Sequence, residues 1–172
     1  MRPEWNDRAA LEVNEDPQAG ADGGVSLEVI DEAGYREMLE SSRGQVVLVD
    51  FWATWCPPCR KLFPHTVQMH HRFADMGLKV VSVSLDDPEE PDERQAVLEF
   101  LAEKEALLGN YISRYGSGGK SFEVFAITGG TVPHFKLYDR NGKLHKTFAS
   151  DSQTIEPEEI ELAIEELLGD SH

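Results

Sequence analysis

The chain contains two cysteines, Cys56 and Cys59, with two prolines between them. A disulfide framework for a small secreted fold would need more cysteines, so two thiols this close indicate a redox pair or half of a metal site. At the start of a helix, unpaired N–H groups and the helix dipole stabilise a thiolate on the first cysteine of such a pair. The pKa of such a thiol falls to roughly 3.5–7.5, which makes it a nucleophile near neutral pH.

The residues on either side of the pair predict a strand followed by a helix. Val46 to Trp52 is a nearly continuous apolar run of strand length, as expected of a central strand buried on both faces. We expect a helix from about Pro58 to Met76, because a proline in the first helical turn removes an N–H that has no partner there. A Cys-x-x-Cys pair beside such a βαβ pattern is typical of a thioredoxin-like redox site.

The rest of the chain alternates between predicted strands and helices, which indicates an α/β fold with a parallel central sheet. Strands are expected at 26–30, 79–85, 134–138 and 143–148, and helices at 31–41 (with Asp31 as its N-cap), 92–108, 121–126 and 157–168. Asn141-Gly142 is a strong hairpin signal, because both residues tolerate the positive φ of a type I′ turn. No convincing strand is visible between 108 and 121, and we interpret this segment as a longer loop.

The segment from Asp50 to Arg60, DFWATWCPPCR, resembles the active-site segment of the thioredoxin superfamily, and within it the TlpA/ResA-like and tryparedoxin-like branches. Pro64 corresponds to the proline that kinks the family's active-site helix, and Pro133 to its cis-proline opposite the disulfide. The resemblance covers about residues 26–168. It implies a thioredoxin-like three-layer sandwich, in which a central mixed β-sheet is flanked by helices and the C-terminal part is a β-hairpin plus a helix.

The resemblance implies a catalytic role for three residues. Cys56 resembles the attacking thiolate, and Cys59 resembles the thiol that resolves the mixed disulfide. Asp50 resembles the buried acid that assists proton transfer to and from the second cysteine, and burial would raise its pKa. The lysine that usually accompanies this acid on the next strand is replaced by Ser82 and Ser84. The alternative interpretation of Asp50 is a buried carboxylate whose hydrogen bonds are satisfied.

Five further residues are expected to bind substrate. Trp55 resembles the tryptophan that covers the site, and Val132 resembles the residue whose backbone docks substrate beside the cis bond to Pro133. Pro57 and Pro58 lie between the two cysteines, where they influence whether the pair works as a reductant or an oxidant.

Other charged residues are interpreted mainly as solvated surface. The run DDPEE at 86–90 is expected to form a solvated acidic turn rather than a cation site. Arg60 and Lys61 either favour acidic partners or are plain surface charge. Three histidines on the predicted active-site helix are also expected at the surface, namely His65, His70 and His71.

The composition excludes several classes of partner. The 172 residues include 16 Lys and Arg against 32 Asp and Glu, a net charge of −16, which argues against a general nucleic-acid-binding surface and against adhesion to an anionic membrane. No apolar run approaches the roughly 20 residues of a membrane-spanning helix. Residues 1–24 are expected to form a disordered acidic leader, and residues 25–169 the thioredoxin-like domain.

These features predict a monomeric thiol–disulfide oxidoreductase that reduces disulfides in partner proteins, needs no cofactor or metal and is recharged by an upstream reductase. No signal peptide is visible, so we expect a cytoplasmic protein if Met1 is the native start and an exported one if the chain has been trimmed. Two alternatives stay open at this point. One is a redox-dependent binding module with little turnover, and the other is a copper or zinc carrier that uses the same two cysteines, with His134 as a further ligand for copper.

Overall fold

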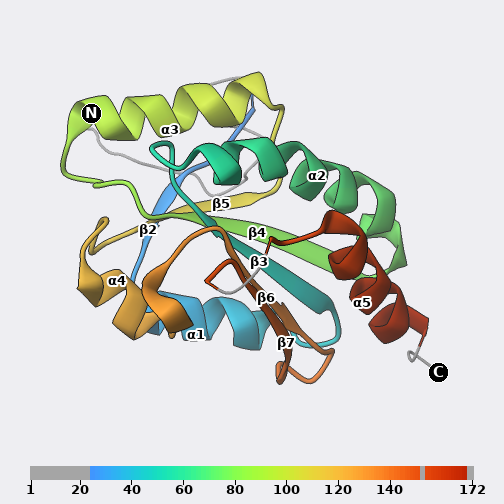
Figure 1. Ribbon diagram of the computed structural model, residues 1–172. Coiled ribbons are helices and arrows are strands. Elements are labelled where there is room, and N and C mark those ends of the chain that lie inside the picture. The colour runs from blue at the N-terminus through green and yellow to red at the C-terminus, as the bar shows by residue number, and fades with distance from the viewer. Residues whose placement is uncertain (1–23, 152–153, 170–172) are drawn as a thin grey trace, which may run out of the picture.

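The computed structural model describes residues 24–151 and 154–169 of the chain, so the expected leader lies outside the described residues apart from Gly24. The described part is built on a six-stranded sheet (Figure 1). In spatial order its strands are β2 (Glu28–Ile30), β5 (Gly109–Ser113), β4 (Leu78–Ser84), β3 (Val46–Trp52), β6 (His134–Tyr138) and β7 (Leu144–Ala149). The first four are parallel, and β6 and β7 add antiparallel pairs. The predicted mixed sheet is therefore confirmed.

Helices cover both faces of this sheet and complete three layers (Figure 1). One face carries α1 (Glu32–Ser41) and α4 (Gly119–Val124), and the other carries α2 (Pro57–Phe73), α3 (Pro91–Glu103) and α5 (Pro157–Gly169). From β3 to β4 and then to β5, the chain moves across the sheet toward the edge formed by β2. From β2 to β3 it moves in the opposite direction, toward the centre of the sheet. Because crossover connections between parallel strands are right-handed, α2 and α3 must lie on one face and α1 on the other.

Strand β3 is the central strand that leads into the cysteine pair, and all seven of its residues are buried, as its apolar run predicts. Successive side chains of a strand point to opposite faces. The Trp52 ring lies 4.8 Å from the Phe63 ring of α2, and the Phe51 ring lies 6.0 Å from the Tyr35 ring of α1. Asp50 therefore shares the α2 face with Trp52.

The segment after α3 differs from the sequence prediction, because it contains a strand rather than a long loop. Strand β5 pairs in parallel with both β4 and β2. Its buried Asn110 donates through Nδ2 to the carbonyl oxygens of Ala106 (2.9 Å) and Leu108 (3.1 Å) and accepts from the Ser82 hydroxyl (2.8 Å). Gly and Asn are depleted in strands, so the local pattern conceals a strand that tertiary hydrogen bonds hold in place.

The predicted boundaries of several elements are close to those observed, but the hairpin turn is of another type. Gly142 has a φ of 79°, whereas Asn141 is not among the described non-glycine residues with positive φ, which excludes a type I′ turn. The Asp139 carboxylate accepts from the backbone N–H groups of Asn141 (2.9 Å) and Lys143 (3.0 Å). This side chain holds a turn in which Gly142 alone has left-handed backbone.

The helix ends and faces follow sequence signals. Asp31 caps α1, since its carboxylate accepts from the Gly34 N–H at 2.9 Å. In α5, four apolar residues form a stripe along one side of the helix and are buried, namely Ile160, Ala163, Ile164 and Leu168. None of the helices in the described ranges is long and apolar enough to span a bilayer.

Replacing Asn110 with alanine is expected to lower the free energy of unfolding by about 3 kcal/mol, because two carbonyl oxygens and one hydroxyl would each lose a buried partner. Urea denaturation of the oxidised protein measures this change. Asn141→Ala makes the same substitution in an exposed turn and should cost less than about 1 kcal/mol. An Asn110→Ala loss no larger than that of Asn141→Ala would contradict the structure of β5.

Candidate active site

Cys56 and Cys59 form a disulfide at the start of α2, with their Cα atoms 5.3 Å apart. Cys56 is the N-cap of the helix, with extended backbone (φ −114°, ψ 99°), and its Sγ accepts from the backbone N–H of Cys59 at 3.2 Å. Pro57 occupies the first helical position. A helix N-terminus offers unpaired N–H groups and a positive dipole end to the Cys56 sulfur, which favours a thiolate there when the pair is reduced.

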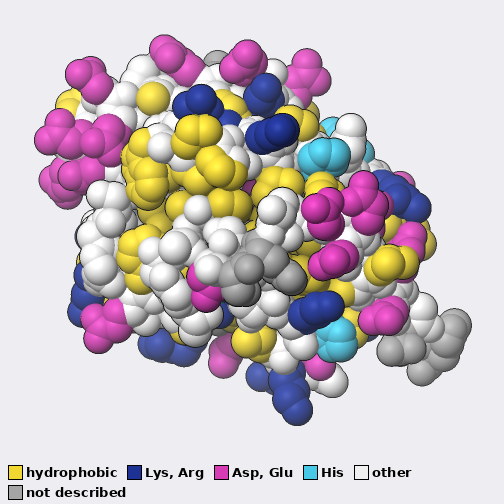
Figure 2. Space-filling model, viewed as in Figure 1, with side chains coloured by type: hydrophobic (Ala, Val, Ile, Leu, Met, Phe, Trp, Pro, Cys, Tyr) yellow, Lys and Arg dark blue, Asp and Glu magenta, His cyan; other side chains and the backbone are white. Residues whose placement is uncertain are grey.

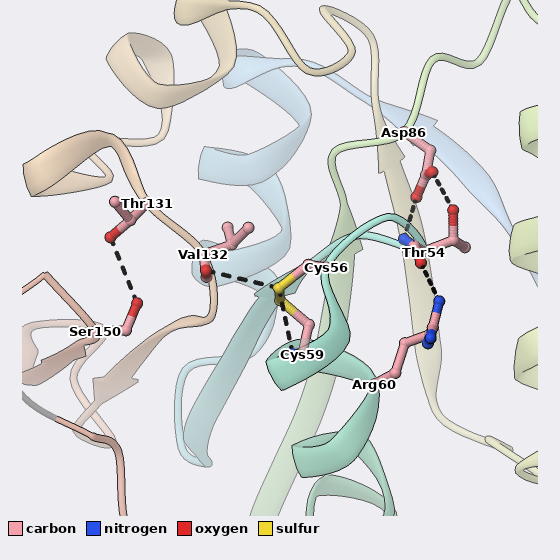
Figure 3. The surroundings of a disulfide bond; sticks show 8 residues. All are labelled: Thr54, Cys56, Cys59, Arg60, Asp86, Thr131, Val132 and Ser150. Atoms are coloured by element: carbon pink, nitrogen blue, oxygen red, sulfur yellow. Dashed lines mark hydrogen bonds between the residues drawn. A yellow bond between two sulfur atoms is a disulfide. The ribbon is translucent and has the colours of Figure 1, made fainter.

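Val132 lies beside the disulfide, as Figure 3 shows. The Val132–Pro133 peptide bond is cis, as the resemblance implied. The carbonyl oxygen of Val132 lies 3.6 Å from the Cys56 Sγ. The backbone of Val132 is therefore next to the Cys56 sulfur.

An open groove of about 980 Å³ runs between the first turns of α2 and the segment that follows β7. Four of the five predicted substrate-binding residues line it, namely Pro57, Pro58, Val132 and Pro133. Trp55 is not among the lining residues, although 49% of it is exposed to solvent. The charged or titratable side chains along the groove are Lys61, His65 and Asp151.

Asp50 is buried beneath α2 and accepts one hydrogen bond, from the Thr66 hydroxyl at 2.8 Å. Cys59, Phe63 and Thr66 are all buried, and their i, i+4, i+7 spacing places them on one face of α2. Asp50 thus contacts the same helix face that carries Cys59. Burial raises the pKa of Asp50 to about 7, although the hydrogen bond from Thr66 acts to lower it. Ser82 lies opposite Asp50 in the parallel register, but its hydroxyl donates to Asn110 rather than to Asp50.

The acidic turn after β4 is only partly solvated, which corrects the sequence prediction for its first residue. Asp86 is fully buried and accepts from the Thr54 backbone N–H (3.0 Å), the Thr54 hydroxyl (2.5 Å) and the Ser84 hydroxyl (2.6 Å). Glu89 and Glu90 are exposed, and acidic side chains gather at the start of α3 in Figure 2. The sequence contains a signal for the contact between Asp86 and Thr54, because each follows a predicted strand, and the carboxyl ends of neighbouring parallel strands meet at one edge of a sheet.

His134 does not join the two cysteines in a metal site. It is fully buried on the α1 face, where its ring lies 6.0 Å from the Phe51 ring, and neither ring nitrogen has a hydrogen-bond partner among the described residues. Burial, with the charge of Lys136, lowers the pKa of His134 to about 4, so its ring is neutral at physiological pH. Within the described residues, no cluster of three or more His, Cys, Asp or Glu side chains could hold a metal ion.

The polar side chains along α2 differ in their exposure to solvent. Arg60 is exposed, and its Nη1 donates to the Thr54 carbonyl oxygen at 2.7 Å. His71 is exposed as expected, whereas His65 and His70 are partly buried. Burial, together with the neighbouring His71, lowers the pKa of His70.

The fold and the site define a thioredoxin-like α/β protein that carries a Cys-x-x-Cys disulfide at the start of a helix. Residues 24–147 match the family model described as the AhpC/TSA family, and the chain belongs to this family.

Curated relatives support the resemblance to ResA-like proteins. The chain is 23% identical to the thiol-disulfide oxidoreductase ResA of Bacillus anthracis over 124 residues, which is 67% of this chain and 61% of that protein. It is 25% identical to ResA of Geobacillus kaustophilus over 135 residues, 78% of this chain and 70% of that one. The chain thus spans about 61% of the length of the first of these relatives.

Solved structures show the same fold. A Chlorobium tepidum protein assigned to thiol:disulfide interchange (DsbE) is 29% identical and superposes with a TM-score of 0.60, covering 78% of this chain and 85% of that one. The thioredoxin domain of a thiol-disulfide oxidoreductase from Bacteroides vulgatus is 27% identical, with a TM-score of 0.54 and coverage of 73% and 84%. These similarities confirm the predicted thioredoxin-like fold class.

The raised pKa of Asp50 predicts a specific dependence of stability on pH. The folded protein keeps the Asp50 proton up to a pH of about 7, whereas the unfolded chain, with a carboxyl pKa near 3.8, loses it earlier. Between these values the folded state binds more protons, so rising pH destabilises it. The free energy of unfolding of the wild type, relative to that of Asp50→Asn, should therefore fall between about pH 4 and 7. A constant difference in urea denaturation across that range would contradict the assigned pKa.

Proposed function

We propose that the protein is a thiol–disulfide oxidoreductase that reduces disulfides in partner proteins. The observation that carries this proposal is the Cys56–Cys59 disulfide at the N-terminus of α2, with an open groove and the Val132 carbonyl beside it. The ResA relatives, whose names describe thiol–disulfide oxidoreductases, support the same reaction class.

In the proposed reaction, two electrons pass from the reduced pair to a partner disulfide. The Cys56 thiolate attacks one partner sulfur, the partner S–S bond breaks, and the other partner sulfur leaves as a thiolate that takes up a proton. Cys59 then loses its proton and attacks the Cys56 Sγ, which breaks the mixed disulfide and releases the second partner thiolate. The protein is left with the Cys56–Cys59 disulfide seen in the structure.

Asp50 is proposed to accept the Cys59 proton in the second step. With a pKa of about 7, its carboxyl group is poised to gain or lose a proton at neutral pH. Its contact with Thr66, on the helix face that carries Cys59, supports this role. A lysine partner is not needed for the raised pKa, since burial alone accounts for its direction.

The substrates proposed are proteins with accessible disulfides, docked along the groove against Pro57, Pro58, Val132 and Pro133. Trp55, half exposed next to Cys56, would contact the partner outside the groove. An upstream reductase would return the pair to the dithiol, and the domain would work as a monomer without a cofactor.

Serine variants of the two cysteines should separate their roles. Cys56→Ser is expected to abolish insulin disulfide reduction, because the attacking sulfur is lost. Cys59→Ser is expected to accumulate a mixed disulfide with a partner, which non-reducing gel electrophoresis detects. Full activity of Cys56→Ser would overturn the proposal, and a wild type that binds a partner in one redox state without insulin turnover would favour the redox-dependent binding module.

The reduction potential of the Cys56–Cys59 pair decides the direction of the reaction. Equilibration against a thiol buffer should give a value near roughly −270 mV, as for thioredoxin, if the protein is a reductant fed by a dedicated electron source. A value of roughly −120 to −180 mV would instead indicate that it forms or rearranges disulfides.

A further inference from the structure

Thr54, two residues before Cys56, is hydrogen-bonded through its amide, its hydroxyl and its carbonyl group. Its N–H and its hydroxyl donate to the Asp86 carboxylate at 3.0 and 2.5 Å. Its carbonyl oxygen accepts from Nη1 of Arg60 at 2.7 Å (Figure 3). Asp86 follows β4 and Arg60 lies in the first turn of α2, so Thr54 is held from two different elements.

The turn that contains Thr54 determines where the Cys56 backbone lies. The Cys56 N–H donates to the Ala53 carbonyl oxygen at 3.2 Å and closes a four-residue turn in which Thr54 is the second residue. Cys56 then has the extended backbone of an N-cap, from which its sulfur reaches both the sulfur and the N–H of Cys59. A change in the conformation of Thr54 therefore moves Cys56.

Asp86 is oriented for this contact. The Ser84 hydroxyl donates to the Asp86 carboxylate at 2.6 Å and accepts from the Asp86 N–H at 3.0 Å, which fixes the side chain at the end of β4. A buried carboxylate is costly unless its oxygens have donors, and two of the three donors of Asp86 belong to Thr54. Hydrogen bonds to a charged acceptor are also stronger than neutral ones.

We infer that Asp86 is a positioning residue for the redox pair, because it holds the Thr54 turn and thereby favours the Cys56–Cys59 disulfide over the dithiol. This inference rests on the proposed redox function. Ring closure between two thiols is more favourable when one is already held in the bonding geometry. If Thr54 is released, the dithiol gains backbone freedom that disulfide formation must remove again. The equilibrium should then shift toward the dithiol, which makes the pair a stronger oxidant.

The test is the equilibrium of the full chain with dithiothreitol. In this reaction the protein S–S bond breaks, dithiothreitol closes its own disulfide, and two electrons and two protons pass to the protein sulfurs. Asp86→Asn and Thr54→Val should each shift the equilibrium constant toward the dithiol by about threefold or more, since each weakens the restraint on one backbone residue. Thr54→Ser keeps the hydroxyl and should stay within about 1.5-fold of the wild type.

The matched control is Glu90→Gln, which makes the same charge change in an exposed residue of the same loop, without a side-chain hydrogen bond at the start of α3. It should leave the equilibrium constant within about 1.5-fold of the wild type. A loss of stability that is equal in both redox forms cannot change this constant, so the readout separates positioning from a general structural role.

Unchanged constants for Asp86→Asn and Thr54→Val, beside a normal wild-type equilibrium, would overturn the inference and leave the proposed function intact. A Thr54→Ser shift as large as that of Thr54→Val would also overturn it, because the hydroxyl would then be irrelevant. If Asp86→Asn does not fold, the comparison of Thr54→Val with Thr54→Ser tests the inference by itself. A wild type without a reversible couple would overturn the proposed function and this inference together.

Discussion

The sulfur of Cys56 occupies the place at the start of α2 that a serine or aspartate oxygen fills in most helices. Pro57 and Pro58 have no N–H, so the first backbone donor within the helix is that of Cys59, and it points at this sulfur from 3.2 Å. The same Cys56 sulfur therefore caps the helix, forms one half of the disulfide and is the proposed nucleophile. The rest of the site keeps that atom in place, with the turn before it, the helix after it and the Val132 backbone beside it.

Two buried carboxylates, Asp50 within β3 and Asp86 just after β4, illustrate how surroundings divide chemical roles. Among the described residues Asp50 has a single donor, Thr66, and burial raises its pKa to about 7, which suits a group that gains and loses a proton. Asp86 accepts from three donors and is held in one orientation, which suits a group that fixes a turn. Asp50 contacts α2 through Thr66, and Asp86 contacts the turn before α2 through Thr54, so both bear on the segment that carries the cysteine pair. They come from neighbouring parallel strands, β3 and β4.

Much of this arrangement could be predicted from the sequence, because its signals are local. The apolar run 46–52, the Asp31 cap and the stripe of α5 each specify an element through backbone propensity or periodic burial. The hairpin was predictable in place but not in type, since the Asp139 carboxylate selects a turn that the Asn-Gly signal does not encode. Strand β5 has no such local signal, because Asn110 is stabilised by Ser82 and by two preceding carbonyl groups rather than by strand propensity.

The sequence by itself determined the Cys-x-x-Cys pair, the strand and helix that present it, and the alternation that requires an α/β sheet, since each depends on residues close together in the chain. Only the tertiary structure decided which polar residues meet that pair. It buried Asp86 against Thr54 across 32 positions of the chain, turned His134 to the opposite face of the sheet, and placed Asp50 beneath Thr66. The physical reason is that burial and hydrogen bonding depend on which strands become neighbours, and strand order is a property of the whole folded chain.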